Sequence, residues 1–301
     1  MRARVLLLSA LLCLPTGCRD RTRGKAPRAG KPRRVASTMV AADEILLTLI
    51  GPQRLVAVTR FSVRPSWSVA AAQARAVKGR IHTVGGEAVL RHRPDLCVLA
   101  DYAHAETALV LRRAGVRIVR LPSARSLATI RRTIRVLGDA VGEPQRAHRI
   151  LAWLDATVAT YRKAVEPLSK RPEVMSATNG FLAGTNTIFD DIVRLAGGQN
   201  VARRLGITGH SRVDTEAIWR ADPSFVLVQA PDQKGALAAA RADPVLSKLA
   251  AVTAGRVLYL PRALLTCASH HIVRSIWVLL RQLHPQLSRS LKPPPPLGPL
   301  R

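Results

Sequence analysis

Two adjacent histidines, His270 and His271, are the first candidates for binding a metal ion or a metal-containing ligand. Imidazole nitrogens bind haem iron, cobalt and zinc. On a helix, however, neighbouring side chains point about 100° apart, so both rings cannot bind one ion in that state. Ser269 is a candidate N-cap, so we weigh a role at a helix N-terminus against a ligand contact by His270. The other histidines are not spaced to converge on one ion, and we predict no metal site.

Aromatic side chains are the second group of candidates, because large planar ligands bind against aromatic faces with a few fixed polar groups. Only 4% of the residues are aromatic, and four of these lie in loops near the ends of predicted strands. Ligands of α/β proteins bind beyond the carboxyl ends of the strands. For Phe61 and Trp67 a role in the core is an equal alternative. The predicted ligand-binding residues are Phe61, Trp67, Tyr102, Phe181, Arg262 and His270.

Motifs of enzyme catalysis are absent from the sequence. There is no Gly-x-Ser-x-Gly elbow, no Walker loop, no Gly-x-Gly-x-x-Gly after a strand and no paired Cys/His nucleophile. The four cysteines include no Cys-x-x-Cys pair, and Cys97 lies in an apolar, strand-like run. A bridge from Cys97 to Cys267 is disfavoured because it would join the two halves described below. We predict no catalytic residue and no cofactor, with an enzyme on a two-lobed scaffold kept as an alternative.

Strand and helix patterns alternate along the chain in two stretches, residues 34–141 and 168–285, each long enough for a lobe. Such alternation predicts parallel strands with crossover helices. The predicted strands are 34–37, 55–59, 96–100, 116–121, 174–177, 225–229 and 256–260. The predicted helices are 42–50, 86–92, 104–114, 126–141, 187–197, 215–221, 235–241, 244–251 and 270–284. We therefore predict an α/β fold of two Rossmann-like lobes with mainly parallel sheets.

The segment 142–167, between the two stretches, has a different pattern. Apolar residues recur with a 3.6-residue period from Ala147 to Val165, between Pro144 and Pro167. A helix of about 22 residues would be about 33 Å long. We predict that one rigid helix joins the lobes and that the ligand cleft lies between them.

An internal repeat relates the two lobes. Glu87 and Glu216 each begin a segment with Glu-Ala, an apolar pair, an Arg and, seven residues after the Glu, a Pro. The offset between the segments is constant at 129 residues. Each segment predicts a short helix, a stop at the Pro and a buried strand, so the two glutamates are structural counterparts.

The formal charge of +28 raises the question of a polyanionic partner. The cations are scattered, with one dense cluster between Arg19 and Arg34, and no nucleic-acid-binding signature is present. Like-charge pairs on helices usually face water. We predict a solvated basic surface and no nucleic-acid binding, and keep a periplasmic polyanion-binding protein as an alternative.

Both ends of the chain differ from the lobes. Residues 1–17 carry two arginines, an apolar run and small residues, which predicts an export signal, and Cys18 follows as a candidate for lipid modification. Simple cleavage and release is the alternative, because Pro15 stands where an apolar residue is usual in such a site. Residues 18–33 predict a flexible basic tether and residues 286–301 a Pro-rich disordered tail.

The order of these segments resembles the solute-binding proteins of ABC importers for iron-siderophores, haem and vitamin B12. The similarity runs from about residue 34 to 285. The segments that carry it are 34–46, the twin Glu-Ala segments at 87 and 216, 187–201, 255–261 and the last helix ending at 283–285.

The resemblance implies a binding protein that captures an iron chelate (siderophore or haem) or cobalamin between the lobes and delivers it to a permease and its ATPase. It implies a monomer in the periplasm or on the outer face of the cytoplasmic membrane. It also implies that Glu87 and Glu216 pair with basic residues of the permease, since two exposed anions give docking its orientation. The alternative for either glutamate is helix stabilisation, because acidic residues favour the first turn.

Overall fold

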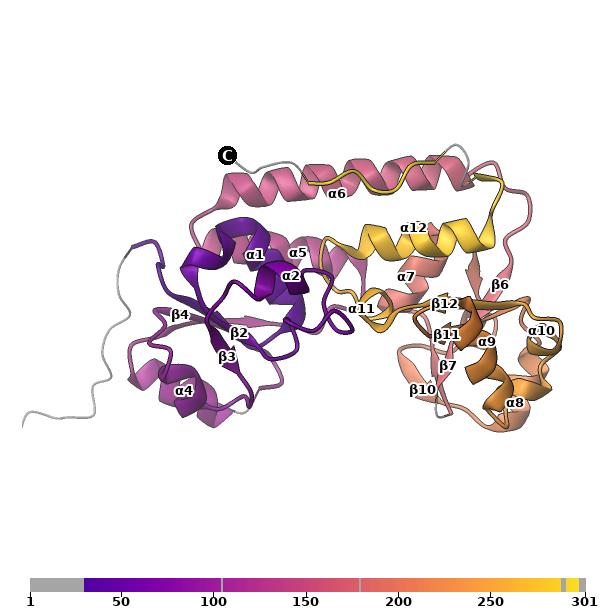
Figure 1. Cartoon of the computed structure of the whole chain (residues 1–301), viewed down its shortest axis with the longest axis horizontal. Helices are drawn as coiled ribbons and strands as arrows, with labels where there is room; N and C mark the ends of the chain where they lie inside the picture. The colour runs from indigo at the N-terminus through magenta and orange to yellow at the C-terminus, as the bar shows by residue number, and fades with distance from the viewer. Residues whose placement is uncertain (1–29, 104, 179, 288–290, 298–301) are drawn as a thin grey trace, which may run out of the picture.

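The computed structural model describes residues 30–103, 105–178, 180–287 and 291–297 of the 301-residue chain. Two α/β lobes lie side by side, and one long helix runs along both of them (Figure 1). The prediction of a two-lobed α/β fold is confirmed. The predicted signal at 1–17 and Cys18 lie outside the described residues.

The N-terminal lobe contains a five-stranded parallel sheet in the order β3-β2-β1-β4-β5. Alternate residues of each strand face opposite sides. One face packs on α1 and α5, and the other packs on α3 and α4. The strands are β1 (Val35–Ser37), β2 (Leu55–Thr59), β3 (Gly79–Ile81), β4 (Leu96–Ala100) and β5 (Arg117–Leu121). The helices are α1 (Val40–Arg54), α2 (Ala71–Ala74), α3 (Gly86–Leu90), α4 (Ala105–Arg113) and α5 (Leu127–Ala140).

The C-terminal lobe contains a four-stranded parallel sheet in the order β12-β11-β6-β9 and a small antiparallel sheet in the order β10-β8-β7. The strands are β6 (Glu173–Met175), β7 (Ala177–Thr178), β8 (Phe181–Ala183), β9 (Gln199–Asn200), β10 (His210–Arg212), β11 (Phe225–Gln229) and β12 (Val257–Leu260). The helices are α7 (Ile188–Leu195), α8 (Thr215–Ala221), α9 (Gln233–Ala242), α10 (Ala250–Thr253), α11 (Arg262–Leu265) and α12 (Ile272–Leu283), with 3-10 turns η1 (Val201–Arg203) and η2 (Leu246–Lys248).

The helix predicted at 244–251 is wrong as a single element. Asp243 accepts hydrogen bonds from the backbone N–H groups of Val245 and Leu246 at 2.9 Å, which favours a separate short turn. Leu249 then has an extended backbone and separates η2 from α10.

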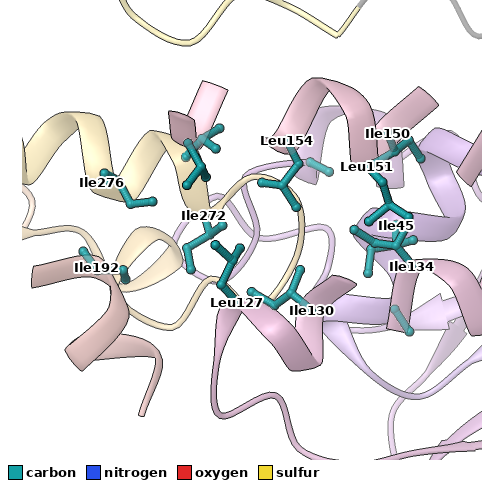
Figure 2. Packing of buried hydrophobic residues seen from close by; sticks show 14 of the residues in the cluster. Ile45, Leu127, Ile130, Ile134, Ile150, Leu151, Leu154, Ile192, Ile272 and Ile276 are labelled. Atoms are coloured by element: carbon teal, nitrogen blue, oxygen red, sulfur yellow. The ribbon is translucent and has the colours of Figure 1, made fainter. Parts of the chain in front are cut away.

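The connecting helix is α6 (Pro144–Val165), with 22 residues and Pro144 in its first turn. Its apolar stripe packs on α5 in one lobe and on α7 and α12 in the other. A continuous apolar seam joins the lobes beneath it (Figure 2). Residues from both lobes and from α6 meet in this seam: Ile45, Leu127, Ile130, Ile134, Ile150, Leu151, Leu154, Ile192, Ile272 and Ile276.

Parts of the two predicted flexible segments are ordered by contacts. Lys31 pairs with Glu143 at 2.8 Å at the start of α6, so the last residues of the predicted tether are bound to the body. The described tail residues 291–297 lie along α6 (Figure 1), and Trp153 Nε1 donates to the Pro295 carbonyl at 3.2 Å. Leu291 and Leu297 also pack against the core, so these residues have defined contacts with the body, and the disorder predicted for the tail stays a prediction.

Candidate ligand cleft

The lobes enclose a cavity of about 710 Å³ between them. The N-terminal lobe contributes residues 123–125, which follow β5, and the C-terminal lobe contributes loops near β6 and β8 and the end of α11. Ser176, Phe181, His210 and Thr266 are among the lining residues. The position agrees with the rule that ligands of α/β sheets bind beyond the carboxyl ends of the strands.

A smaller cavity of about 160 Å³ lies against the first turns of α1 and is lined by Glu44 and Trp67 from one lobe and by Ala263 and Cys267 from the other. Thr266 and Ala268 line both cavities, so they form neighbouring parts of one cleft. The larger cavity falls in the range typical of small-molecule sites.

The predicted residues Phe61, Trp67 and Arg262 form one stack at this junction. The Phe61 and Trp67 ring centroids lie 4.6 Å apart, and the Arg262 guanidinium carbon lies 3.5 Å from the Trp67 centroid. Arg60 covers the Phe61 ring at 4.8 Å. Because Arg262 belongs to the C-terminal lobe, its cation–π contact with Trp67 crosses the cleft. The aromatic faces are therefore combined with fixed positive charge.

Phe181 and Tyr102 have different positions. Phe181 is 47% exposed and lines the larger cavity, where its ring is available to a ligand. Tyr102 is 75% exposed, follows β4 and does not line either cleft cavity. The structure therefore brings Phe181, but not Tyr102, into the described cleft.

The predicted ligand contact by His270 is not supported, because the side chain is fully buried. Its Nε2 lies 3.2 Å from Thr48 Oγ1 of the other lobe, and burial lowers the pKa of His270 to about 3. The imidazole is therefore neutral at neutral pH. Ser269 is not the N-cap of α12, which begins after His271; its hydroxyl instead accepts from His271 N–H at 3.2 Å.

Two adjacent buried acids, Asp43 and Glu44, lie near the start of α1 at this junction, and Glu44 contacts the other lobe. Burial raises the pKa of Asp43 to about 8, although its Oδ2 accepts from Ser62 Oγ at 2.6 Å and from Thr59 N–H at 2.9 Å. Burial also raises the pKa of Glu44. We call the hydrogen-bonded group around these acids the polar seam.

Glu44 makes the connection between lobes in the polar seam. Its Oε1 accepts from Ser68 Oγ at 2.7 Å and from Val69 N–H at 3.0 Å, whereas its Oε2 accepts from Ser269 Oγ at 2.5 Å. Ser269 belongs to the C-terminal lobe. One buried carboxyl group therefore fixes the loop after β2 against the loop before α12.

Sequence reasoning missed these acids, although a signal was present. Asp43 and Glu44 are consecutive in a helix that continues as Ile45-Leu46-Leu47, and all five side chains are buried. Consecutive residues cover more than half of a helix circumference, so an apolar run beside two acids leaves little polar face for them. Arg125 and His210 were also missed, because only the folded chain brings them to the cavity.

The charge in the cleft is positive. Arg125 lines the larger cavity, while Arg60, Arg64 and Arg262 surround the aromatic stack. Glu44 is the only acidic residue among the described residues that line the two cavities. Its carboxyl group is buried, so the accessible charge is that of the arginines.

The counterpart glutamates occupy equivalent places in the two lobes. Glu87 lies in the first turn of α3 and Glu216 in the first turn of α8. Both are exposed, and neither forms an ion pair with a described residue. Each helix leads directly into a buried strand, β4 or β11, so the repeat seen in the sequence is a repeat in the structure.

Three further observations concern metal binding, the cysteines and membrane spans. Among the described residues, no group of three His, Cys, Asp or Glu side chains is placed to hold a metal ion. Cys97 and Cys267 are buried free thiols. Within the same described ranges, no helix combines the length and apolar character needed to cross a membrane.

Two α/β lobes, one connecting helix and a cleft between the lobes define a two-lobed binding protein. Residues 35–264 match the family described as periplasmic binding protein, so the chain belongs to that family.

A cobalamin-binding protein of Halobacterium salinarum is 26% identical over 235 residues, which cover 76% of this chain and 63% of the relative. The chain therefore spans less than two thirds of that relative. An uncharacterized ABC transporter substrate-binding lipoprotein of Bacillus subtilis is 22% identical over 269 residues, 85% of this chain and 81% of the relative. The periplasmic haem-binding protein RhuT of Roseiflexus has a similar fold, with a TM-score of 0.72 and 23% identity over 85% of this chain and 99% of RhuT.

Proposed function

We propose that this protein is the substrate-binding component of an ABC importer and captures an iron chelate (siderophore or haem) or cobalamin. The observation that carries the proposal is the cavity of about 710 Å³ between the lobes, with an aromatic and arginine stack beside it. Relatives that bind cobalamin or haem support this ligand class. Catalysis and a resident cofactor have no part in the proposal.

The charge of the cleft favours an anionic ligand within that class. Arg125 lines the larger cavity, and Arg262 of the opposite lobe stacks on Trp67 beside the smaller one. The described cavity linings offer no accessible carboxylate against these charges. Carboxylate groups of a chelate form strong, often bidentate hydrogen bonds with arginine. A ferric chelate or a porphyrin with free carboxylates therefore fits this cleft better than a neutral ligand.

Delivery to the permease is proposed to use Glu87 and Glu216. The two carboxylates are exposed, equivalent in the repeat and set in a protein of formal charge +28. Such isolated charges give orientation to docking on a basic partner. The protein would act as a monomer and pass the ligand to the permease of an ATPase-driven importer.

The proposed location is the periplasm or the outer face of the cytoplasmic membrane, with Cys18 as the lipid-modified residue. The lipoprotein relative supports an anchor. Fractionation of cells that express Cys18→Ala tests it: the variant should leave the membrane fraction, and unchanged membrane association would contradict a lipid anchor at this residue.

Tryptophan fluorescence tests ligand capture. The exported chain is titrated with haemin, cobalamin and several ferric siderophores, and at least one should quench the emission. Trp67→Phe should weaken binding and reduce quenching, whereas Trp219→Phe, a change at a partly exposed residue of α8, should preserve affinity. No response to any of these ligands would overturn the proposed ligand class. Binding to heparin is compared in the same way: if it disappears at modest salt while chelate binding persists, polyanion binding comes from the general basic surface and chelate binding from the cleft.

A second measurement tests delivery. Glu87→Gln combined with Glu216→Gln should leave ligand affinity unchanged and reduce uptake by cells that carry the importer. The matched control is Glu106→Gln, which removes an exposed acid from the first turn of α4. Equal uptake by the double variant and the control would show that the two glutamates do not take part in docking.

A further inference from the structure

A second cavity, of about 850 Å³, lies in the C-terminal lobe away from the cleft. Every residue that lines it falls between positions 159 and 203. It lies where the end of α6 passes α7 and β9. Figure 1 shows α7 beneath the connecting helix. The N-terminal lobe contributes nothing to it, so its shape does not depend on the cleft.

The lining of this cavity is strongly basic. Five of its 12 residues are Arg or Lys, compared with 47 of 301 in the whole chain, and Glu166 is its only acid. The general basic composition does not explain this concentration. The five cationic residues come from α6, the segment after it, α7 and η1: Arg162, Lys163, Arg171, Arg194 and Arg203.

Helix electrostatics account for some of these cations but not for the site. Arg162 and Lys163 lie in the last turn of α6 and Arg194 in the last turn of α7. Positive charge at a helix C-terminus interacts favourably with the helix dipole. Arg171 and Arg203 have no such role in these helices. Convergence from four separate segments on one cavity therefore needs another explanation.

Two of the guanidinium groups are held in place by carboxylates. Arg203 donates to Asp190 through Nη2 at 2.6 Å and Nε at 3.2 Å, and Asn200 Nδ2 donates to the same carboxylate at 3.2 Å. Asp190 is 4% exposed, so this anchor is buried. Arg194 pairs with Asp191 at 2.6 Å. Groups positioned in this way lose little entropy when an anion binds.

The other three cations have no carboxylate partner. Arg162, Lys163 and Arg171 are exposed and form no ion pair within the described part of the chain. Apolar side chains, Val165 and Leu195, supply the floor beside them. The cavity thus combines unneutralised charge with a buried apolar surface.

We propose that this cavity is a second binding site, for a small organic phosphate in which a phosphate group is attached to an apolar part. The guanidinium fork matches phosphate oxygens in two parallel hydrogen bonds, and Lys163 adds a point charge. The apolar part would lie on Val165 and Leu195. The site is independent of the interlobe cleft and of the ligand carried there.

Calorimetric titration of the exported chain with phenyl phosphate tests the proposal, with inorganic phosphate as the probe that lacks an apolar part. Phenyl phosphate should bind more tightly than inorganic phosphate. The variant Arg162→Gln/Lys163→Gln/Arg171→Gln should weaken binding at least about tenfold, because it removes three charged hydrogen-bond donors from the cavity.

The matched control is Arg112→Gln/Arg113→Gln/Arg132→Gln, which removes the same charge from exposed positions of the N-terminal lobe. It should change the affinity less than about twofold, because exposed charges beyond a Debye length are screened. Equal weakening in both triple variants would overturn the proposal. It would also be overturned if the parent chain bound neither phenyl phosphate nor vesicles that contain phosphatidylglycerol. Trp67→Phe should leave phenyl phosphate binding intact, so failure of the cleft ligand and failure of this site are separate results.

A lipid headgroup could supply the same phosphate chemistry. Co-sedimentation with vesicles of phosphatidylglycerol and phosphatidylcholine distinguishes this source from a soluble ligand. Vesicle binding that is lost in the first triple variant and kept in the control would support the site with lipid as its source. Vesicle binding that survives in both variants would place lipid contact elsewhere on the basic surface.

Discussion

The lobes meet in two regions of opposite chemistry. Beneath α6 the contact is the apolar seam, where Leu154 of the connecting helix meets residues of both lobes (Figure 2). At the cleft the contact is the polar seam, where Glu44 accepts from Ser68 of one lobe and Ser269 of the other.

The two regions contribute to the junction in different ways. Apolar burial contributes stability without direction, whereas hydrogen bonds between buried groups have defined geometry and are sensitive to protonation. We therefore expect the apolar seam to determine whether the lobes stay joined, and the polar seam to determine how the cleft walls are positioned.

The largest effect is expected from Leu154→Ala. Leu154 is fully buried in the apolar seam, and removal of its side chain should lower the free energy of unfolding by about 2–5 kcal/mol. Urea unfolding measures the change. Leu109→Ala, at a residue that is 46% exposed, is the control and should change stability by less than about 0.5 kcal/mol. Separate unfolding transitions for the two lobes would contradict a continuous seam.

A smaller loss of stability is expected from Ser269→Ala in the polar seam. The change removes the donor to Glu44 Oε2 and leaves a buried carboxyl oxygen less satisfied, at a cost of about 1–3 kcal/mol. Ligand affinity should also fall, since the cleft loop loses its anchor. Ser66→Ala, at an exposed serine of the same cleft region, should change neither property. A stability loss without any change in ligand affinity would show that the polar seam does not position the cleft.

The third expectation concerns pH. Burial raises the pKa of Asp43 from 3.8 to about 8, so the folded state holds a proton that the unfolded state releases. The stability contributed by this proton is present at low pH and is lost as pH rises through the folded pKa. Asp43→Asn should therefore gain stability relative to the parent as pH rises from about 5 to about 8.

Chemical unfolding at several pH values measures this difference, with Asp139→Asn at an exposed acid as the control. The comparison with the parent matters because His270 acts in the opposite direction. Its folded pKa of about 3 lies below 6.5, so its contribution to stability is lost as pH falls below 6.5. A difference between Asp43→Asn and the parent that does not change with pH would show that Asp43 is ionised in the folded protein.

The repeated elements were predictable from sequence because their signals are local. Helix α8 spans Thr215–Ala221 as predicted, since Asp214 caps its start and a left-handed Asp222 before Pro223 ends it. The antiparallel sheet was not predicted, because β8 and β10 pair across a long intervening segment and each strand has three residues. A three-residue strand carries too little alternation to be recognised.

The site was predictable only where it depended on strand ends. Trp67 and Phe181, which were predicted from that rule, line the two cavities, whereas Phe61 and Arg262 lie in the stack on Trp67 without lining either one. Their contact with a ligand stays a prediction. The position of His270 was not predictable, because its burial depends on Thr48, which lies 222 residues away in the sequence. Glu44 and Ser269 are 225 residues apart, so local sequence patterns could not predict their hydrogen bond in the polar seam either.

The smallest effect is expected where the tail covers the connecting helix. Trp153→Phe keeps the aromatic ring but removes the N–H that donates to the Pro295 carbonyl, so the free energy of unfolding should fall by less than about 1 kcal/mol. The local consequence should be larger than the global one, because this hydrogen bond holds a segment that contributes little to the core. Limited proteolysis should therefore remove the tail faster from Trp153→Phe than from Trp277→Phe, because the indole N–H of Trp277 has no hydrogen-bond partner within the described residues. Equal cleavage rates would mean that the hydrogen bond from Trp153 does not hold the tail. The apolar contacts of Leu291 and Leu297 with the core would then be enough to hold it.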